Sequence, residues 1–135
     1  MRLVAVPTAV LAALTGALLL TGVASAVPSA AHRDFIGNLR TPDWQKSLLD
    51  EQQVAGPVRV TLTQLDAPLT GACFRLVRRE APNQELTRPV CVARGDRSEH
   101  TLTSRLGKGV RFQLQVKADG KWERGRNAYA GKLRF

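Results

Sequence analysis

Three residues at alternate positions, Asp96, Ser98 and His100, are of the types that form a nucleophilic triad. On a strand their side chains would lie on one face, but side chains two residues apart run parallel and do not point at one another. The pattern therefore favours His100 as a surface residue of a strand. No G-x-S-x-G, S-x-x-K or H-E-x-x-H motif occurs in the chain. We expect no catalytic residue and no enzyme activity.

Metal and cofactor sites are also not expected from the residue types. Two cysteines and two histidines are too few for a four-cysteine zinc site or an iron-sulfur cluster held by four cysteines. The histidines are far apart, because His32 precedes the expected sandwich and His100 lies within it. No P-loop or Rossmann glycine pattern is present. We therefore expect no metal and no cofactor.

The first 26 residues have the layout of a secretory signal peptide. After Arg2 no charged residue occurs before Arg33, and residues 11–20 are the most apolar part of this lead. Small residues then end at Ala26, where we place the cleavage, with Ala31 as the second choice. The alternative is a retained transmembrane anchor, although prolines and glycines interrupt the run. The chain is expected to be secreted, extracellular and without a transmembrane segment after cleavage.

Cys73 and Cys91 are the only cysteines, and both remain after cleavage. Because an exported protein folds in an oxidising compartment, we expect them to form a disulfide bond. The alternative is a redox-active pair or a nucleophilic cysteine, but the spacing is long and no known motif surrounds either residue.

The 135-residue chain has a net charge of +9, and most of this charge lies in its last third. After cleavage 19 basic and 11 acidic residues remain, a net charge of +8. Residues 33–66 carry four bases and five acids, whereas residues 105–135 carry nine bases and two acids. The basic character is therefore local.

Residues 27–57 are expected to be an N-terminal arm followed by one short helix. Residues 27–40 show no period and predict the arm. Thr41, Pro42 and Asp43 are typical of a helix start, and the residues from Ala55 to Pro57 are typical of a stop. Trp44 within this helix is interpreted as a packing anchor rather than a ligand platform.

Residues 58–135 show the period of two that is typical of half-buried strands. Apolar residues alternate with polar ones over 58–63, and again over 110–117. Asp119 and Gly120 then predict a two-residue hairpin that returns over 121–123. Six or seven short strands indicate an all-β fold, a small antiparallel β-sandwich linked by the disulfide.

One family resemblance rests on two stretches of this region. Residues 58–63 lead into 68–76, which contain G-A-C-F-R-L, and residues 107–109 precede Phe112. These stretches resemble the strand, the G-A-x-F-x-L strand and the glycine turn of prealbumin-like Cna-B/SpaA domains. They cover about half of the mature chain. Leu62 stands where many such domains carry the isopeptide-forming lysine, so we infer no crosslink. The secretion signal, the single disulfide and the G-x-L-x-F ending of residues 131–135 also resemble small secreted proteins of Gram-positive bacteria. Both resemblances imply a non-catalytic β-sandwich.

The basic C-terminal hairpin is the candidate binding surface. If its strands are adjacent, their outward bases merge into one cationic face that attracts anionic polymers. We expect a binding or interaction module that contacts an anionic polymer or protein at the cell envelope or outside the cell, with no specific nucleic acid. The alternatives are a solvated face that only keeps the chain soluble, a small enzyme inhibitor that offers residues 80–87, or a small hydrolase or toxin. The predicted contact residues are Arg111, Lys117, Lys121, Arg124, Arg126, Lys132 and Arg134.

Overall fold

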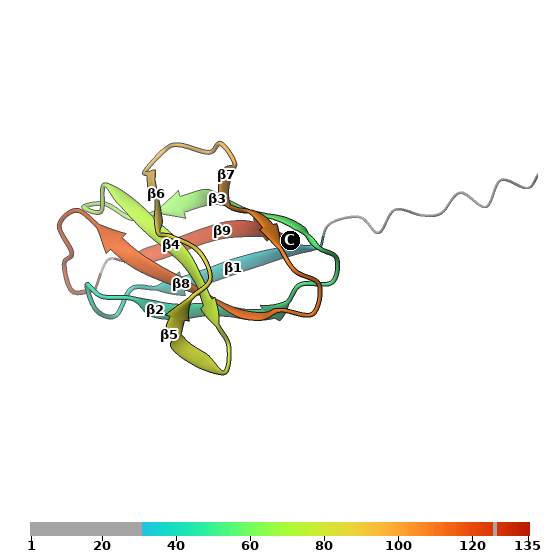
Figure 1. The fold of residues 1–135 in the computed structure, drawn as a ribbon. Coiled ribbons are helices and arrows are strands. Elements are labelled where there is room, and N and C mark those ends of the chain that lie inside the picture. Colours follow the sequence, from blue (N-terminus) through green and yellow to red (C-terminus); the bar gives the residue numbers. More distant parts are fainter. Residues whose placement is uncertain (1–30, 126) are drawn as a thin grey trace, which may run out of the picture.

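The computed structural model describes residues 31–125 and 127–135 as two antiparallel β-sheets packed face to face (Figure 1). The predicted all-β sandwich is confirmed, and these residues hold more strands than the six or seven expected. The nine strands are β1 (His32–Asn38), β2 (Gln45–Glu51), β3 (Gly56–Leu65), β4 (Gly71–Arg78), β5 (Ala81–Glu85), β6 (Val90–Ala93), β7 (His100–Leu106), β8 (Arg111–Asp119) and β9 (Ala128–Arg134).

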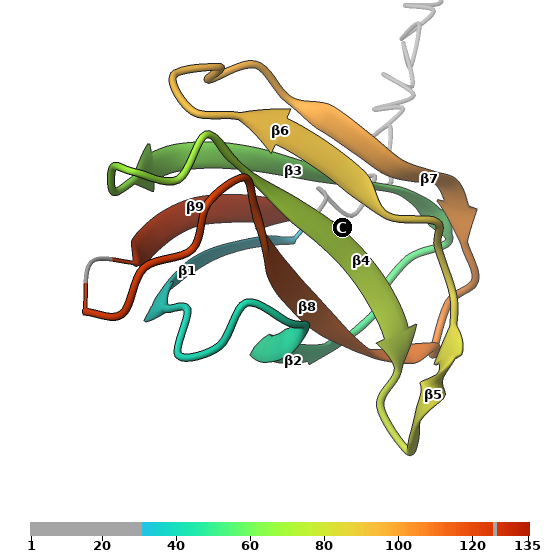
Figure 2. The same cartoon turned by 90° about the vertical axis from the view of Figure 1, so that its left-hand side faces the viewer.

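The chain passes back and forth between the two sheets. Sheet 1 has the strand order β1-β9-β3-β7, and sheet 2 has the order β2-β8-β4-β5, with β6 also paired to β4. The connections β1 to β2, β3 to β4 and β8 to β9 lie together at one end of the sandwich, which we call the loop end (Figure 1). The hairpin of β4 and β5 projects from the body at the other end (Figure 2).

Alternating apolar residues fill the space between the sheets, as the period of two predicts. Val58, Val60 and Leu62 of β3 face Leu114 and Val116 of β8 across the core, and all five are at most 3% exposed. Each such side chain contributes roughly 1.5–3 kcal/mol when it leaves water. The polar residues that alternate with these apolar residues therefore lie on the outer faces of the sheets.

Gly131 allows β1 to approach β9 closely. A Cβ atom at this position would collide with the ring of Phe35 and with the carbonyl oxygen of Thr61. The Phe35 ring instead packs 5.8 Å from the ring of Phe74 in the opposite sheet, measured between centroids. The glycine thus lets the ring of an edge strand reach the core.

The short helix predicted between Thr41 and Ala55 is wrong, because residues 45–51 form β2 and pair with β8. The expected capping groups hold a turn instead: Asp43 Oδ1 accepts from Trp44 N–H at 2.7 Å, and Thr41 Oγ1 accepts from Asp43 N–H at 3.3 Å. Leu48 packs against the core from a bulged strand. The described residues contain no helix. Pairing with β8 outweighs the local helix signals.

Two other expectations about organisation are also corrected. The predicted N-terminal arm is wrong from His32 to Asn38, because this segment forms β1 and pairs with β9 over its whole length. The predicted hairpin after Gly120 is wrong as well, since residues 121–123 are not a strand and the chain crosses to sheet 1. The predicted signal peptide lies outside the described residues. Within the described part, no helix is long and apolar enough to span a membrane.

Candidate functional site

The predicted disulfide bond is confirmed. Cys73 on β4 and Cys91 on β6 are direct partners in the antiparallel register, and their sulfur atoms are bonded. The bond lies on the outer face of sheet 2, because the neighbouring residues Ala72 and Phe74 face the core. It closes a loop between two cysteines that are 18 positions apart in the sequence. In the chain-entropy model a loop of this size stabilises the fold by about 3 kcal/mol.

The turn between β6 and β7 brings Asp96, Ser98 and His100 together, contrary to the expectation that they run parallel. The Ser98 hydroxyl donates to Asp96 Oδ1 at 2.5 Å, and His100 Nε2 lies 2.9 Å from Asp96 Oδ2. The hydroxyl and backbone N–H of Ser98, together with a smaller effect of His100, lower the pKa of the Asp96 carboxyl from 3.8 to about 2. The acid therefore stays ionised and organises the turn.

This cluster does not have the geometry of a catalytic triad. In a triad one imidazole nitrogen faces the acid and the other faces the nucleophile. Here the same Nε2 of His100 faces both Asp96 and Ser98, at 2.9 Å and 3.3 Å, while the serine hydroxyl donates to the acid. Neither Ser98 nor His100 lines the clefts at the loop end or the hollow on the outer face of sheet 1. The cluster fits a structural role in the turn.

A cleft of about 590 Å³ opens at the loop end between the edge strands β1 and β2. Arg40 and Lys46 contribute its charges, and Trp44 and Tyr129 contribute aromatic surface. The Ser47 hydroxyl is buried beside it with no hydrogen-bond partner among the described residues. We call this hollow the β1–β2 cleft. Its lining residues are Ile36, Gly37, Asn38, Arg40, Thr41, Trp44, Gln45, Lys46, Ser47 and Tyr129.

A second cleft of about 420 Å³, the Trp122 cleft, adjoins the first and shares Asn38 and Arg40 with it. Trp122 Nε1 donates to the carbonyl oxygen of Leu39 at 3.0 Å, which ties the β8 to β9 connection to the end of β1. Arg124 adds a further cation. Asn127 is 4% exposed, and its Oδ1 has no partner within the described residues.

Trp44 lies on the outer face of sheet 2 and is not part of the described core, so the interpretation as a packing anchor is wrong. The guanidinium carbon of Arg75 lies 4.2 Å from its ring centroid, and Nζ of Lys117 lies 5.8 Å away. Arg75 is held in place by Gln115 Oε1 at 2.8 Å and by Glu85 Oε1 at 2.6 Å. The indole therefore lies half-buried next to two cations and contributes to the wall of the β1–β2 cleft.

The charges of the two clefts are all positive. Arg40, Lys46 and Arg124 line them, and no acidic residue of the described chain does. None of the three forms an ion pair with another described residue. The guanidinium and ammonium groups are thus available to a carboxylate or a phosphate.

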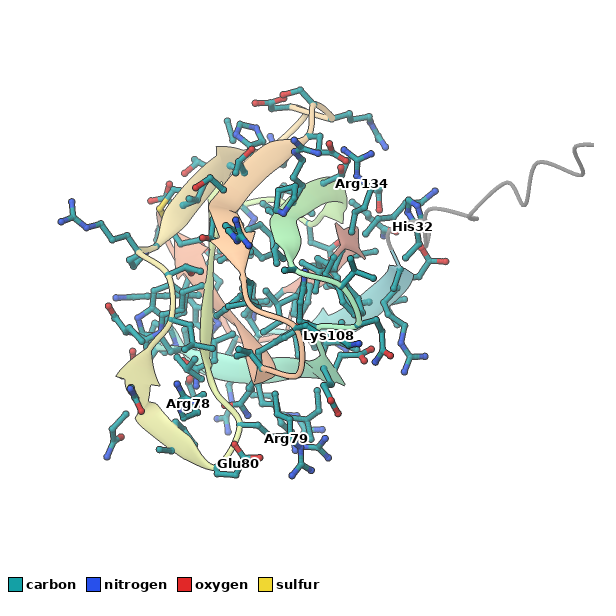
Figure 3. The ribbon with its side chains drawn as sticks, turned by 45° about the vertical axis from the view of Figure 1, so that its right-hand side comes forward. His32, Arg78, Arg79, Glu80, Lys108 and Arg134 are labelled. Atoms are coloured by element: carbon teal, nitrogen blue, oxygen red, sulfur yellow. A yellow bond between two sulfur atoms is a disulfide. The ribbon has the colours of Figure 1, made fainter. Side chains whose placement is uncertain are left out.

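The predicted basic face is not formed, because β8 and β9 belong to different sheets. Lys132 and Arg134 point outward from sheet 1, and Arg134 pairs with Glu99. Arg111 lies at the far end of β8 and pairs with Glu80 at 3.0 Å. Figure 3 shows Arg134 next to His32, apart from Glu80 at the tip of the β4 and β5 hairpin.

Three of the predicted residues do gather at the loop end. Arg124 lines the Trp122 cleft, and Lys117 lies against Trp44. Lys121 lies near by in sequence and faces Glu123 at 3.5 Å. Arg126 lies outside the described residues. Sequence reasoning missed Arg40 and Lys46 because their segment was interpreted as arm and helix.

One signal in the sequence could have found the missed residues. Each of the two tryptophans, Trp44 and Trp122, is followed two positions later by a base, Lys46 and Arg124. The structure brings both tryptophan segments to the loop end. Neither a known protein family, nor a curated protein, nor a solved structure matches the chain. The resemblance to Cna-B/SpaA domains therefore stays a prediction.

Proposed function

We propose that the protein is a secreted, non-catalytic binding module that contacts an anionic partner at the cell envelope or outside the cell through the two clefts of the loop end. The observation that carries the proposal is that every charged residue lining these clefts is a cation without a described acidic partner. The Cys73–Cys91 disulfide is compatible with the extracellular location.

The chemistry of the clefts supports this assignment. Arg40 and Arg124 carry planar guanidinium groups that bind carboxylates and phosphates with two parallel hydrogen bonds. Arg40 lines both clefts, so one extended anionic ligand can contact all three cations without leaving the surface. The two indoles and the Tyr129 ring add apolar area, which is the usual composition of a binding cleft.

The test compares two triple variants that change the net charge equally. The cleft variant carries Arg40→Gln, Lys46→Gln and Arg124→Gln, and the control carries Arg88→Gln, Arg105→Gln and Lys108→Gln. None of the control residues forms an ion pair with a described residue or lines either cleft. Binding to polygalacturonate and to polyphosphate is measured by calorimetry over a series of salt concentrations.

We expect the cleft variant to bind at least tenfold more weakly, and the slope of log affinity against log salt to become shallower by about 2 to 3 units. The control variant should bind like the wild type, because its charges lie outside the clefts. Equal losses in both variants would show that only net charge matters. Absence of wild-type binding at low salt would overturn the proposal.

A second function, that of an enzyme inhibitor, is favoured by the β4 and β5 hairpin. All residues of β5 are exposed, and the hairpin projects beyond the sandwich (Figure 2). Arg75 bonds Glu85, Arg78 Nε bonds Gln84 Oε1 at 3.0 Å, and both bonds brace the hairpin. A braced, exposed segment is what an inhibitor presents to an enzyme cleft.

This alternative is tested on a panel of extracellular serine and metalloproteases. Inhibition by the wild type that disappears when residues 81–85 are replaced by a Gly-Ser segment of equal length would support it. The cleft variant serves as the control, because it leaves the hairpin unchanged. No inhibition of any enzyme in the panel would count against an inhibitory role.

A further inference from the structure

Strand β1 is an edge of sheet 1 that is protected neither by a bulge nor by a short length. It pairs with β9 through seven consecutive residue pairs, with no irregularity in the register. Its residue Ile36 is 80% exposed, the most exposed of the large hydrophobic side chains in the described chain. A regular, exposed edge strand with an apolar side chain is a template for pairing with another strand.

The other edges of the two sheets are protected. The register between β7 and β3 shifts at two places, and the register between β2 and β8 shifts between Lys46 and Leu48. At the remaining edge β5 has only two pairs with a shift between them, and β6 has four residues. Bulges and short strands are the means by which proteins block edge pairing. Among the described strands, β1 is the edge without them.

The unpaired backbone groups of β1 can be identified from the hydrogen bonds at its ends. Ala31 and Phe135 exchange both backbone hydrogen bonds, and Leu39 N–H donates to the carbonyl oxygen of Asn127. Because bonded and non-bonded pairs alternate in an antiparallel ladder, the odd-numbered residues between them bond β9. The N–H and C=O groups of His32, Asp34 and Ile36 therefore point to the free edge.

Hollows flank the free edge on both of its faces. The β1–β2 cleft lies on the side of the core, and a hollow of about 330 Å³ lies on the outer face of sheet 1. Ile36 lines both, and Asp34, Ala130 and Lys132 also line the outer hollow. Side chains of an added strand alternate between the two faces of the sheet. Side chains of an added strand that lie next to Ile36 would thus find space on both faces.

The charges of the clefts identify the kind of strand that fits. Arg40 and Lys46 face the β1–β2 cleft without acidic partners among the described residues, so side chains on this face should be acidic. A second copy of the chain does not meet this requirement. Its β1 would turn Arg33, Phe35 and Gly37 to the cleft face, and none of them is acidic.

We infer that β1 binds an extended acidic segment of a partner protein as an additional strand of sheet 1. The segment places carboxylates in the β1–β2 cleft and apolar side chains against Ile36 on the outer face. The main-chain hydrogen bonds to β1 supply affinity, and the alternating side chains supply specificity. This inference rests on the proposed function, because it specifies the anionic partner as a peptide segment.

The test uses two short capped peptides, one of alternating valine and glutamate and one of alternating valine and lysine. Hydrogen exchange of the full chain is followed by NMR with each peptide. With the acidic peptide the amides of Asp34 and Ile36 should become protected, whereas the amides of Arg33 and Phe35, which already bond β9, should change little. The lysine peptide should protect none of them.

A pair of variants separates the backbone bonds from the side chain. Ile36→Pro removes one free-edge donor but no bond to β9, and Ile36→Thr keeps the donor while trimming the apolar side chain. We expect Ile36→Pro to bind the acidic peptide about tenfold more weakly than Ile36→Thr does. Unchanged melting temperatures of both variants show that the fold is retained. Equal binding by the two variants would overturn strand addition.

Two further outcomes distinguish the competing explanations. If polygalacturonate binds and the acidic peptide does not, the proposed function holds and strand addition is wrong. If neither binds at low salt, both proposals fail. A concentration-dependent dimer in sedimentation, abolished by Ile36→Pro in the absence of peptide, would instead assign the edge to a second copy of the chain.

Discussion

Two groups of cations in this molecule differ in whether an acid accompanies them. On the outer face of sheet 1, Arg59 and Arg134 both face Glu99, and we call this group the Glu99 cluster. At the loop end, Arg40 and Lys46 line a cleft that contains no described acid. Both groups consist of basic residues, but one carboxylate offsets part of the charge of the first group, and no described acid offsets that of the second. The difference shows why a net charge of +9 does not by itself locate a binding site.

Ion pairs of this kind contribute little to stability, because both partners remain in contact with water. Arg134 and Glu99 have side chains 36% and 37% exposed, and exposed pairs are worth roughly 0–1 kcal/mol. Their main effect is on the surface potential, since a paired guanidinium attracts a second anion less strongly. The two groups of cations therefore differ in ligand binding rather than in their contribution to stability. Both binding and stability can be measured in variants.

The largest expected effect is on stability and leaves both groups of cations intact. Replacing Cys73 and Cys91 by alanine should lower the free energy of unfolding by about 3 kcal/mol, because the unfolded chain regains the freedom of the closed loop. Urea titration measures this change. Polyanion binding well below the melting temperature should be unchanged. A loss of binding in the folded variant would show that the disulfide positions the clefts.

Charge reversal in the two groups should give unequal effects on binding. Arg40→Glu places an acid beside Lys46 and should weaken polygalacturonate binding about tenfold or more. Arg134→Glu changes the net charge equally, but it alters an arginine that is already paired with Glu99, so binding should change less than about twofold. Titration calorimetry of both variants checks this. Similar losses in the two would remove the distinction between the groups.

Removing the acid of the Glu99 cluster should produce a smaller change in the opposite direction. Glu99→Gln frees Arg59 and Arg134 and should raise affinity for polygalacturonate about two- to threefold, with a stability change within about 1 kcal/mol. The gain should vanish at high salt, where exposed charges are screened. If affinity does not rise, binding by a group of bases does not depend on whether an acid is paired with them.

The smallest effect concerns the carboxyl group of Asp96, which lies next to the imidazole of His100. Its lowered folded pKa means that the ionised carboxylate stabilises the turn above the unfolded pKa of 3.8, and that this stabilisation is lost as pH falls toward about 2. Asp96→Asn should therefore lower the melting temperature near neutral pH, and the difference from the wild type should shrink below about pH 4. Thermal unfolding at several pH values measures it. A difference that grows on acidification would contradict this account.

Strands with clean alternation could be predicted from the sequence. The patterns of β3 and β8 identified core residues, because alternating apolar residues indicate which face of a strand is buried. The two cysteines identified the disulfide, because no other partner was available to either of them. Segment 41–53 could not be predicted in this way. Its helix-start residues act within a turn, and its strand character comes from pairing with β8, which is distant in sequence.

The candidate site escaped prediction for a related reason. The sequence places Lys117 and Lys132 fifteen positions apart on what looks like one hairpin, but a crossover separates them into two sheets. Conversely Arg40 and Arg124 are far apart in sequence and line the same cleft. Local patterns determine which face a side chain takes, whereas the sheet to which a strand belongs depends on pairing along the whole chain.

The position of β9 has a consequence for how the chain folds during synthesis. This strand lies between β1 and β3 in sheet 1. Strand β1 pairs with no other described strand, so it has no partner until β9 has left the ribosome. Contacts between segments about a hundred residues apart form slowly. Strands β3 and β7 can pair before then, but sheet 1 is completed only after translation has passed residue 134, and β1 stays unpaired until that point.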